Sequence, residues 1–174
     1  DGVVYSGSGI VNEHGMLGLP KDAHIFFYTC AGNKSKWSLG KTFNQRIAYS
    51  TDGGKSIAKL EGSVVKHISE ENRDPKVYWH EESRAFYMVL YLKANDFMIL
   101  RSKDLKNWKK TQVLTLDQAS ECPDLREVPV EGGGSKWMFW TADGFYFLGD
   151  FDGYEFKSDG VRHEAYLTGI PYAA

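Results

Sequence analysis

Apolar and aromatic residues gather in short runs that alternate with polar, glycine-containing turns along the chain. Five such runs stand out, at residues 24–29, 85–92, 97–100, 136–141 and 144–148. Short runs rich in aromatic and β-branched residues, bounded by polar residues or glycine, predict β-strands. No stretch has a convincing helical period, and residues 117–120 would form one turn at most. The pattern therefore predicts an all-β fold.

Aspartate-centred turns recur after three of the strands. Asp52, Asp104 and Asp152 are separated by 52 and 48 residues. An Asp side chain accepts hydrogen bonds from backbone N–H groups further along such a turn, which explains why this residue type recurs. A repeat of about 40 to 50 residues built from short strands is typical of a β-propeller blade. Three ordinary hairpins with a chance regular spacing are the alternative.

A second series of motifs runs in step with the first. Its members, each expected just before a strand-rich segment, are Ser6-Gly7-Ser8, Arg73-Asp74-Pro75, Glu121-Cys122-Pro123 and Pro171-Tyr172-Ala173. Asp74 and Glu121 lie 47 residues apart, almost one repeat. Residues at the same place in neighbouring blades converge at the mouth of the central channel. The spacing thus predicts two carboxylates that face one cavity.

Composition and charge narrow the possible partners. The 174 residues include 14% aromatic residues and 18 Gly against 5 Pro, a mixture that favours short strands and tight turns. The formal net charge of −2 gives no electrostatic footprint for nucleic acid or an anionic membrane. No apolar run approaches the roughly 20 residues of a membrane-spanning helix. Neither the histidines nor the two cysteines, Cys30 and Cys122, have metal-ligand spacing, so we expect no metal, and the redox state of the cysteines stays open.

Two motifs contain residues suited to catalysis. In Arg73-Asp74-Pro75, a guanidinium and a carboxylate together could hold neighbouring sugar hydroxyls. An ordinary turn is the structural alternative. Glu121, if partly buried against Cys122, could serve as a general acid, whereas a solvated loop glutamate is its alternative. The one-repeat spacing of the two acids favours the functional interpretation of both.

Six segments in order along the chain resemble one enzyme family. They are residues 5–8, 47–54, 73–77, 121–125, 149–153 and 172–174. Together they identify the sequence as similar to the β-fructosidases (invertases, levanases and inulinases) of glycoside hydrolase family thirty-two. The resemblance implies a five-bladed β-propeller and retaining hydrolysis of β-fructosyl bonds in sucrose or fructans. It also implies a carbohydrate as the partner, no cofactor, and a secreted, periplasmic or cell-surface location.

The resemblance also implies roles for individual residues. Asp74 would bind fructosyl hydroxyls and stabilise the transition state, with Arg73 beside it. Glu121 would be the acid/base. Tyr5, where the family more usually has Phe, and Ser6 would line the fructose pocket.

One catalytic motif of the family has no counterpart here. Retaining hydrolysis needs a second carboxylate about 5 to 5.5 Å from the acid. The family's nucleophile lies in a Trp-x-Asn-Asp-Pro-Asn-Gly motif, and this chain has no Asn-Asp-Pro run. We therefore expect residues 1–174 to form part of the catalytic propeller, namely blades two to four and the start of five. We expect this part alone to be inactive and to form an open arc whose ends another copy or further chain covers.

Three other interpretations remain. Residues 50–57 resemble the Asp-box of sialidase propellers, but no arginine cluster for a substrate carboxylate is evident. An inverting arabinan- or xylan-cleaving propeller would need three acids, and the Glu121-Cys122 pair argues against it. A non-catalytic carbohydrate-binding propeller segment would fit a chain without a nucleophile.

Overall fold

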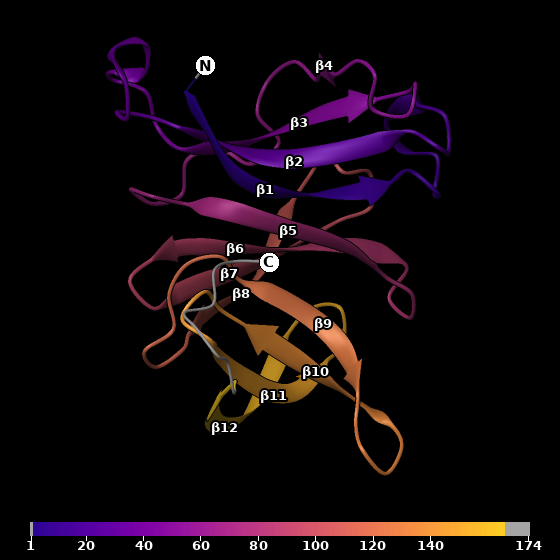
Figure 1. Ribbon diagram of the computed structural model, residues 1–174, viewed down its shortest axis with the longest axis vertical. Coiled ribbons are helices and arrows are strands. Elements are labelled where there is room, and N and C mark those ends of the chain that lie inside the picture. The colour runs from indigo at the N-terminus through magenta and orange to yellow at the C-terminus, as the bar shows by residue number, and fades with distance from the viewer. Residues whose placement is uncertain (1, 166–174) are drawn as a thin grey trace.

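The computed structural model describes residues 2–165, which form three four-stranded antiparallel sheets (Figure 1). The first sheet contains β1 (Val3–Val11), β2 (His24–Ala31), β3 (Asn44–Ser50) and β4 (Ala58–Lys59). The second contains β5 (Arg73–His80), β6 (Ala85–Lys93), β7 (Asp96–Ser102) and β8 (Lys109–Thr115). The third contains β9 (Asp124–Pro129), β10 (Ser135–Trp140), β11 (Phe145–Phe151) and β12 (Phe156–Glu164). Two short 3-10 helices, η1 (Met16–Gly18) and η2 (Lys36–Ser38), lie in the loops of the first sheet.

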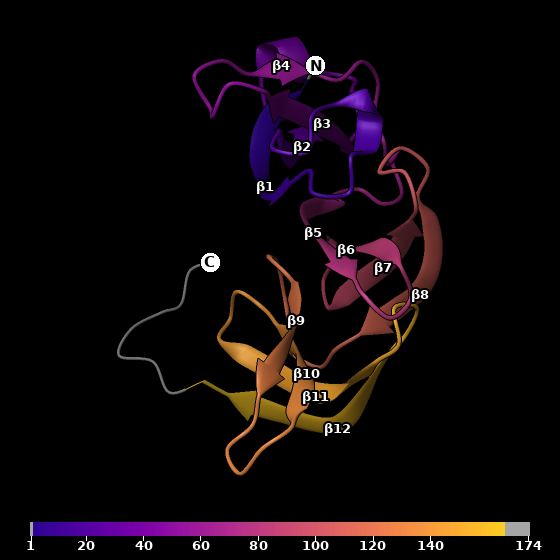
Figure 2. The same cartoon turned by 90° about the vertical axis from the view of Figure 1, so that its right-hand side faces the viewer.

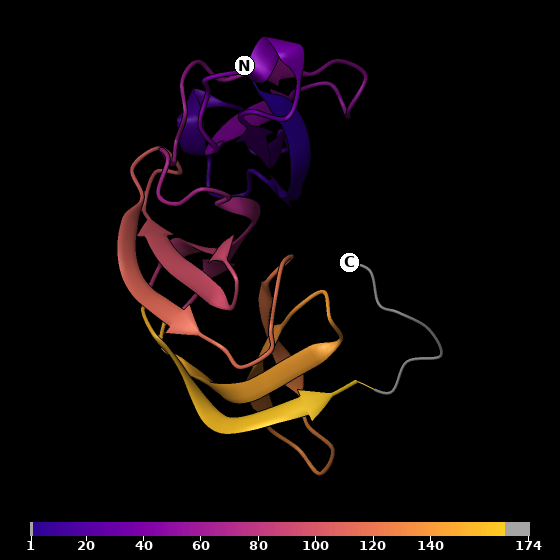
Figure 3. The ribbon, with the colours of Figure 1, turned by 90° about the vertical axis from the view of Figure 1, so that its left-hand side faces the viewer.

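The three sheets are arranged side by side in an open arc (Figures 2 and 3). In each sheet the strands follow one another in chain order, so that β1, β5 and β9 lie on the inner side and β4, β8 and β12 on the outer side. This is the geometry of neighbouring propeller blades. The predicted all-β, incomplete propeller is confirmed, and all five predicted strands are present.

The second sheet is buried on both faces, and β6 shows this most directly. Phe86, Met88 and Leu90 of β6 face a core shared with Ile25 and Phe27 of the first sheet. The alternate residues of β6 face a second core, shared with the third sheet; they are Tyr87, Val89 and Tyr91. Burial on both faces explains why residues 85–92 form an unbroken apolar run, because neither side of the strand meets water.

The turn after the third strand of each sheet has the predicted aspartate. Asp52 accepts a hydrogen bond from the backbone N–H of Ser56 at 3.0 Å. Asp104 accepts from the N–H of Asn107 at 2.7 Å, and Asp152 from that of Tyr154 at 2.8 Å. The repeat thus follows the blades.

Some details differ from the sequence prediction or fall outside the described residues. Ser6-Gly7-Ser8 lies inside β1, and Arg73-Asp74-Pro75 forms the start of β5, so neither motif precedes its strand. A bulge interrupts the regular pairing at each of them. The segment at 171–173 lies outside the described residues. Cys30 and Cys122 are both free thiols. Within residues 2–165, no helix is long and apolar enough to cross a membrane.

Candidate active site

A cavity of about 410 Å³ opens where the inner strands of the three sheets begin. The early part of β1, the start of β5 and the loop before β9 each contribute to it. All five residues singled out from the sequence line this cavity, and four others join them. The complete lining is Tyr5, Ser6, Lys34, Phe43, Glu71, Arg73, Asp74, Glu121 and Cys122.

Two β-bulges at the same end of neighbouring sheets shape the cavity. In β1, Tyr5 pairs with Thr29 and Gly7 with Tyr28, so Ser6 is the extra residue. In β5 the register also shifts, between Arg73 and Lys76. Bulges turn side chains out of the regular alternation, and they are common beside active sites. A β-bulge in each of two sheets therefore presents one cavity-lining residue, Ser6 from β1 and Asp74 from β5.

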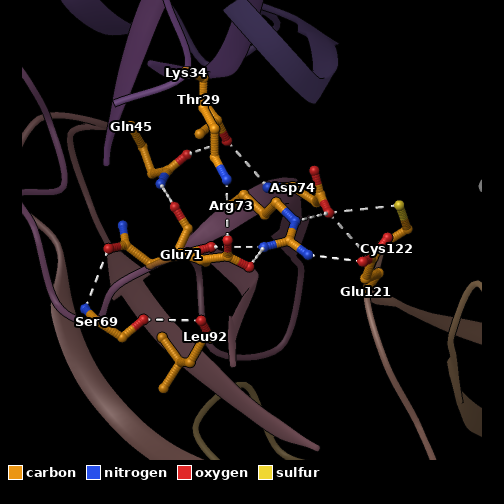
Figure 4. A network of polar contacts seen from close by, with 11 residues as sticks. Thr29, Lys34, Gln45, Ser69, Glu71, Arg73, Asp74, Leu92, Glu121 and Cys122 are labelled. Atoms are coloured by element: carbon orange, nitrogen blue, oxygen red, sulfur yellow. Dashed lines mark hydrogen bonds and ion pairs between the residues drawn. The ribbon is translucent and has the colours of Figure 1, made fainter. Parts of the chain in front are cut away.

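Arg73 is the electrostatic centre of the cavity (Figure 4). Its Nη2 lies 2.8 Å from Oε1 of Glu121, and its Nη1 lies 2.8 Å from Oε2 of Glu71. Its Nε lies 3.6 Å from Oδ2 of Asp74, and the guanidinium lies 4.4 Å from the ring centre of Tyr91. Burial alone would lower the pKa of Arg73, but the adjacent carboxylates outweigh it and raise that pKa. A permanent cation thus links acids from two sheets.

Asp74 is the most deeply placed of the acids, with only 6% of its surface exposed. Its Oδ2 accepts hydrogen bonds from the backbone N–H of Cys122 at 3.3 Å and from the Cys122 thiol at 3.5 Å. Burial raises the pKa of Asp74, opposed in part by the Cys122 amide and Arg73. Burial and the neighbouring Asp74 together raise the pKa of Cys122 to about 12. Cys122 is therefore a neutral thiol that donates to Asp74.

Glu121 lies at the rim of the cavity, in a strained turn. Glu121 and Cys122 have φ values of 52° and 43°, in the left-handed region that non-glycine residues rarely adopt. This turn points the Cys122 thiol at Asp74 and leaves the Glu121 side chain 52% exposed. The partial burial against Cys122 that would favour a general acid is therefore absent, and Glu121 has the exposure of a loop glutamate. Its carboxylate is thus open to solvent while it is held by Arg73.

Lys34, Phe43 and Glu71 were not expected in the cavity. Lys34 lies in the loop between β2 and β3, and its Nζ is 3.2 Å from Oε1 of Glu71. Hydrogen bonds from Arg73 and then Lys34 lower the pKa of Glu71. Phe43 packs edge-on against Tyr5, with ring centres 6.1 Å apart. Glu71 lies in the turn before β5, outside any strand, so strand alternation does not predict its position. The position of Lys34 has no signal in the sequence.

Comparison with known proteins gives a consistent result. Residues 1–170 match the model of the glycosyl hydrolases family 32 N-terminal domain. The chain is 34% identical to an invertase from Debaryomyces hansenii and 34% identical to an extracellular exo-inulinase from Meyerozyma guilliermondii. Each alignment covers 90% of this chain but only 32% and 33% of the relative, so the chain spans about a third of their length.

Solved structures are similar as well. The E230A variant of fructofuranosidase from Schwanniomyces occidentalis, complexed with fructosylnystose, superposes with a TM-score of 0.78 at 31% identity. The match covers 90% of this chain and 33% of that one.

Proposed function

The chain belongs to family 32 of the glycosyl hydrolases, and from this premise we propose that the protein hydrolyses β-fructosyl linkages in sucrose or in fructans such as levan and inulin. The family membership decides against the sialidase and arabinanase alternatives. The arrangement that carries the proposal is Arg73, held between Asp74 of one sheet and Glu121 of the next in a single cavity. Either acid alone would be equally compatible with an ordinary surface turn, so the proposal depends on the two acids together.

Each acid has a place suited to a different task. Asp74, buried and fixed by Cys122, holds the hydroxyls of a fructosyl unit and stabilises the charge that develops on its ring. Glu121, at the exposed rim, protonates the leaving oxygen and then activates a water molecule. Tyr5 and Ser6 line the same cavity as these acids and form part of the fructosyl pocket. Arg73 fixes the two carboxylates relative to each other.

The remaining carboxylate belongs, in this proposal, to a part of the protein outside these 174 residues. Retaining hydrolysis requires a nucleophile near the acid. The described part contributes blades two to four of a five-bladed propeller, and residues 1–174 alone are inactive. The expected start of the fifth blade falls outside the described residues. The face of the third sheet that points away from the second sheet has half-buried aromatic residues, including Trp140, which is stacked on Tyr146. These residues support the packing of a further blade against that face. By analogy with its extracellular relative, the protein acts outside the cytoplasm.

The test is fructose release by the full-length protein that carries this chain. Wild-type protein should release fructose from sucrose, inulin or levan, and Glu121→Ala should lower kcat by about 10²- to 10⁴-fold, the usual range for a lost general acid/base. Near-normal turnover by Glu121→Ala would refute its assignment. No turnover by the wild type on any of the three substrates would favour a non-catalytic carbohydrate-binding role.

A further inference from the structure

The backbone at Asp74 is held in an unfavourable conformation next to the site. Asp74 has a φ of 59° and lies in the bulge of β5, between the paired residues Arg73 and Lys76. A left-handed conformation at a non-glycine residue is strained, and it persists only where the surroundings enforce it. The Asp74 N–H is also buried away from its own sheet's ladder, so it needs another acceptor. That acceptor comes from the first sheet.

The acceptor is the hydroxyl of Thr29 on β2. The Asp74 N–H donates to Thr29 Oγ1 at 3.1 Å, and Thr29 donates its only hydroxyl proton to Oε1 of Gln45 at 2.8 Å. Gln45 lies directly opposite Thr29 on β3, and its Nε2 donates to the backbone oxygen of Asn72 at 2.8 Å. Thr29, Gln45 and Asn72 are all completely buried. The directions of these bonds follow from the two backbone groups at the ends of the chain (Figure 4). The Asn72 carbonyl oxygen can only accept, so Gln45 turns Nε2 toward it and Oε1 toward Thr29, which must donate; the Asp74 N–H can only donate, so Thr29 Oγ1 accepts from it.

This chain of hydrogen bonds anchors the backbone on both sides of Arg73. Asn72 is held at its carbonyl oxygen and Asp74 at its amide, both from the first sheet. The Asn72 side chain adds a third anchor, since its Oδ1 accepts from the N–H of Ile68 at 3.0 Å. The backbone that carries Arg73 and Asp74 is thus held by a neighbouring blade as well as by the pairing of Arg73 with Tyr91 in its own sheet.

We propose that Thr29 and Gln45 are positioning residues for the active site: their buried hydrogen bonds hold the strained backbone at Asp74 in the conformation that aims its carboxylate and the Arg73 guanidinium into the cavity. The proposal rests on the proposed function for its kinetic consequence. Its structural part, the anchoring of Asp74, stands independently. Displacing a catalytic group by about 1 Å can cost on the order of 10²-fold in rate, so a small backbone shift suffices.

The kinetic experiment uses Thr29→Val and Thr29→Ser in the full-length protein, with kcat and KM measured for sucrose and inulin. Thr29→Val keeps the shape but removes the acceptor, and it should lower kcat at least about 10-fold. Thr29→Ser restores a hydroxyl and should recover activity to within about 3-fold of wild type. In an Asp74→Asn background, Thr29→Val should have little further effect, because the two residues act as a unit. An equal effect of Thr29→Val in both backgrounds would overturn the proposal.

Ser8 offers a matched control. Its Oγ accepts from the Val77 N–H of β5 at 3.1 Å, the same kind of bond between the same two sheets, further from Asp74. Ser8→Ala should lower the melting temperature about as much as Thr29→Val does but leave kcat within about 2-fold of wild type, because this bond positions no catalytic group. If the kcat of both variants falls in parallel with stability, Thr29 is merely structural and the proposal fails.

Amide hydrogen exchange separates this inference from the proposed function. Thr29→Val should speed exchange at the Asp74 amide by about 10-fold or more while the interior of β6 keeps its protection. Unchanged exchange at Asp74 would overturn the anchoring even if the enzyme is active. A wild-type protein that releases no fructose would refute the proposed function, and the exchange measurement would still decide whether Thr29 anchors Asp74.

Discussion

The bulge in β1 depends on Gly7, and replacing that residue by alanine is a demanding test of how the cavity is built. A Cβ at position 7 would overlap the carbonyl oxygen of Phe27, and it would lie 2.7 Å from the Phe27 carbonyl carbon and 2.9 Å from Cα of Tyr28. All three obstructing atoms belong to the backbone of β2, so no side-chain rotation can relieve the overlap. Gly7→Ala therefore forces β1 away from β2.

The size of the displacement follows from ordinary contact distances. Carbon atoms pack at about 3.5 to 4.0 Å, so the two carbon contacts alone require β1 to move by roughly 1 Å at Gly7, and the overlap with the Phe27 oxygen requires more. Tyr5 and Ser6 precede Gly7 directly and would move with it out of the cavity wall. A shift of about 1 Å at a binding group can cost on the order of 10²-fold in rate, and we expect kcat/KM for sucrose to fall about that far.

Gly9 provides the control on the same strand. A Cβ there would lie 3.2 Å from Cδ1 of Phe26, which is a side-chain atom that can rotate aside. Gly9→Ala in the full-length protein should keep kcat/KM within about 3-fold of wild type, because backbone pairing is undisturbed. If Gly7→Ala is as active as Gly9→Ala, β1 does not depend on close approach to β2, and the bulge does not set the positions of Tyr5 and Ser6.

Two further predictions concern stability. Leu90 is completely buried between the first two sheets, so Leu90→Ala should lower the free energy of unfolding by about 3 kcal/mol in urea titrations. The control, Val113→Ala on the exposed side of β8, should lower it by less than about 0.5 kcal/mol. Similar losses for the two variants would contradict the assigned core. For Asp104, burial alone would raise the pKa, but hydrogen bonds from Asn107 and the backbone outweigh it and lower the pKa to about 2. Because the pKa of Asp104 is lower in the folded than in the unfolded protein, its ionised carboxylate stabilises the fold above about pH 4, and this contribution is lost as the pH falls toward 2. At an exposed site the contribution to the free energy of unfolding is at most about 1 kcal/mol. Asp104→Asn should therefore flatten the decline of unfolding free energy between pH 4 and 2, and an unchanged slope would refute the role of this carboxylate.

Local patterns and the repeat explain what the sequence could predict. The apolar run at 85–92 marks a strand because both faces of β6 are buried, which leaves no polar position to interrupt it. Asp52, Asp104 and Asp152 were recognisable because each bonds backbone groups within four residues of itself. These are short-range properties, and the sequence contains them in full.

Predicting that Asp74 and Glu121 share one cavity required one further inference, namely that each sequence repeat forms one propeller blade. Because blades are equivalent, a spacing of one repeat translates into neighbouring positions around the channel. Contacts that cross between sheets do not follow from spacing in this way. Nothing in the loop around Lys34 indicates that its ammonium group turns toward Glu71, and nothing near Thr29 or Gln45 indicates that they hold the backbone at Asp74. Such contacts depend on how two sheets pack.

The backbone conformation at Glu121 could not be predicted from the sequence either. The sequence left two possibilities open for Glu121, partial burial against Cys122 and a solvated loop position. The two consecutive left-handed φ values instead separate the side chains, sending the thiol inward and the carboxylate to the rim. Strain of this kind is imposed by the surrounding structure and leaves no pattern in the sequence.

The division of labour between Glu121 and Asp74 is the central claim, and the dependence of rate on the leaving group tests it most directly. The measurement compares kcat/KM for sucrose with that for an aryl β-fructofuranoside, whose phenolate leaves with little help from an acid, in full-length Glu121→Ala and Asp74→Ala. Glu121→Ala should lose about 10²-fold or more on sucrose and much less on the aryl substrate, whereas Asp74→Ala should lose activity equally on both. Equal losses on the two substrates for Glu121→Ala would contradict the account.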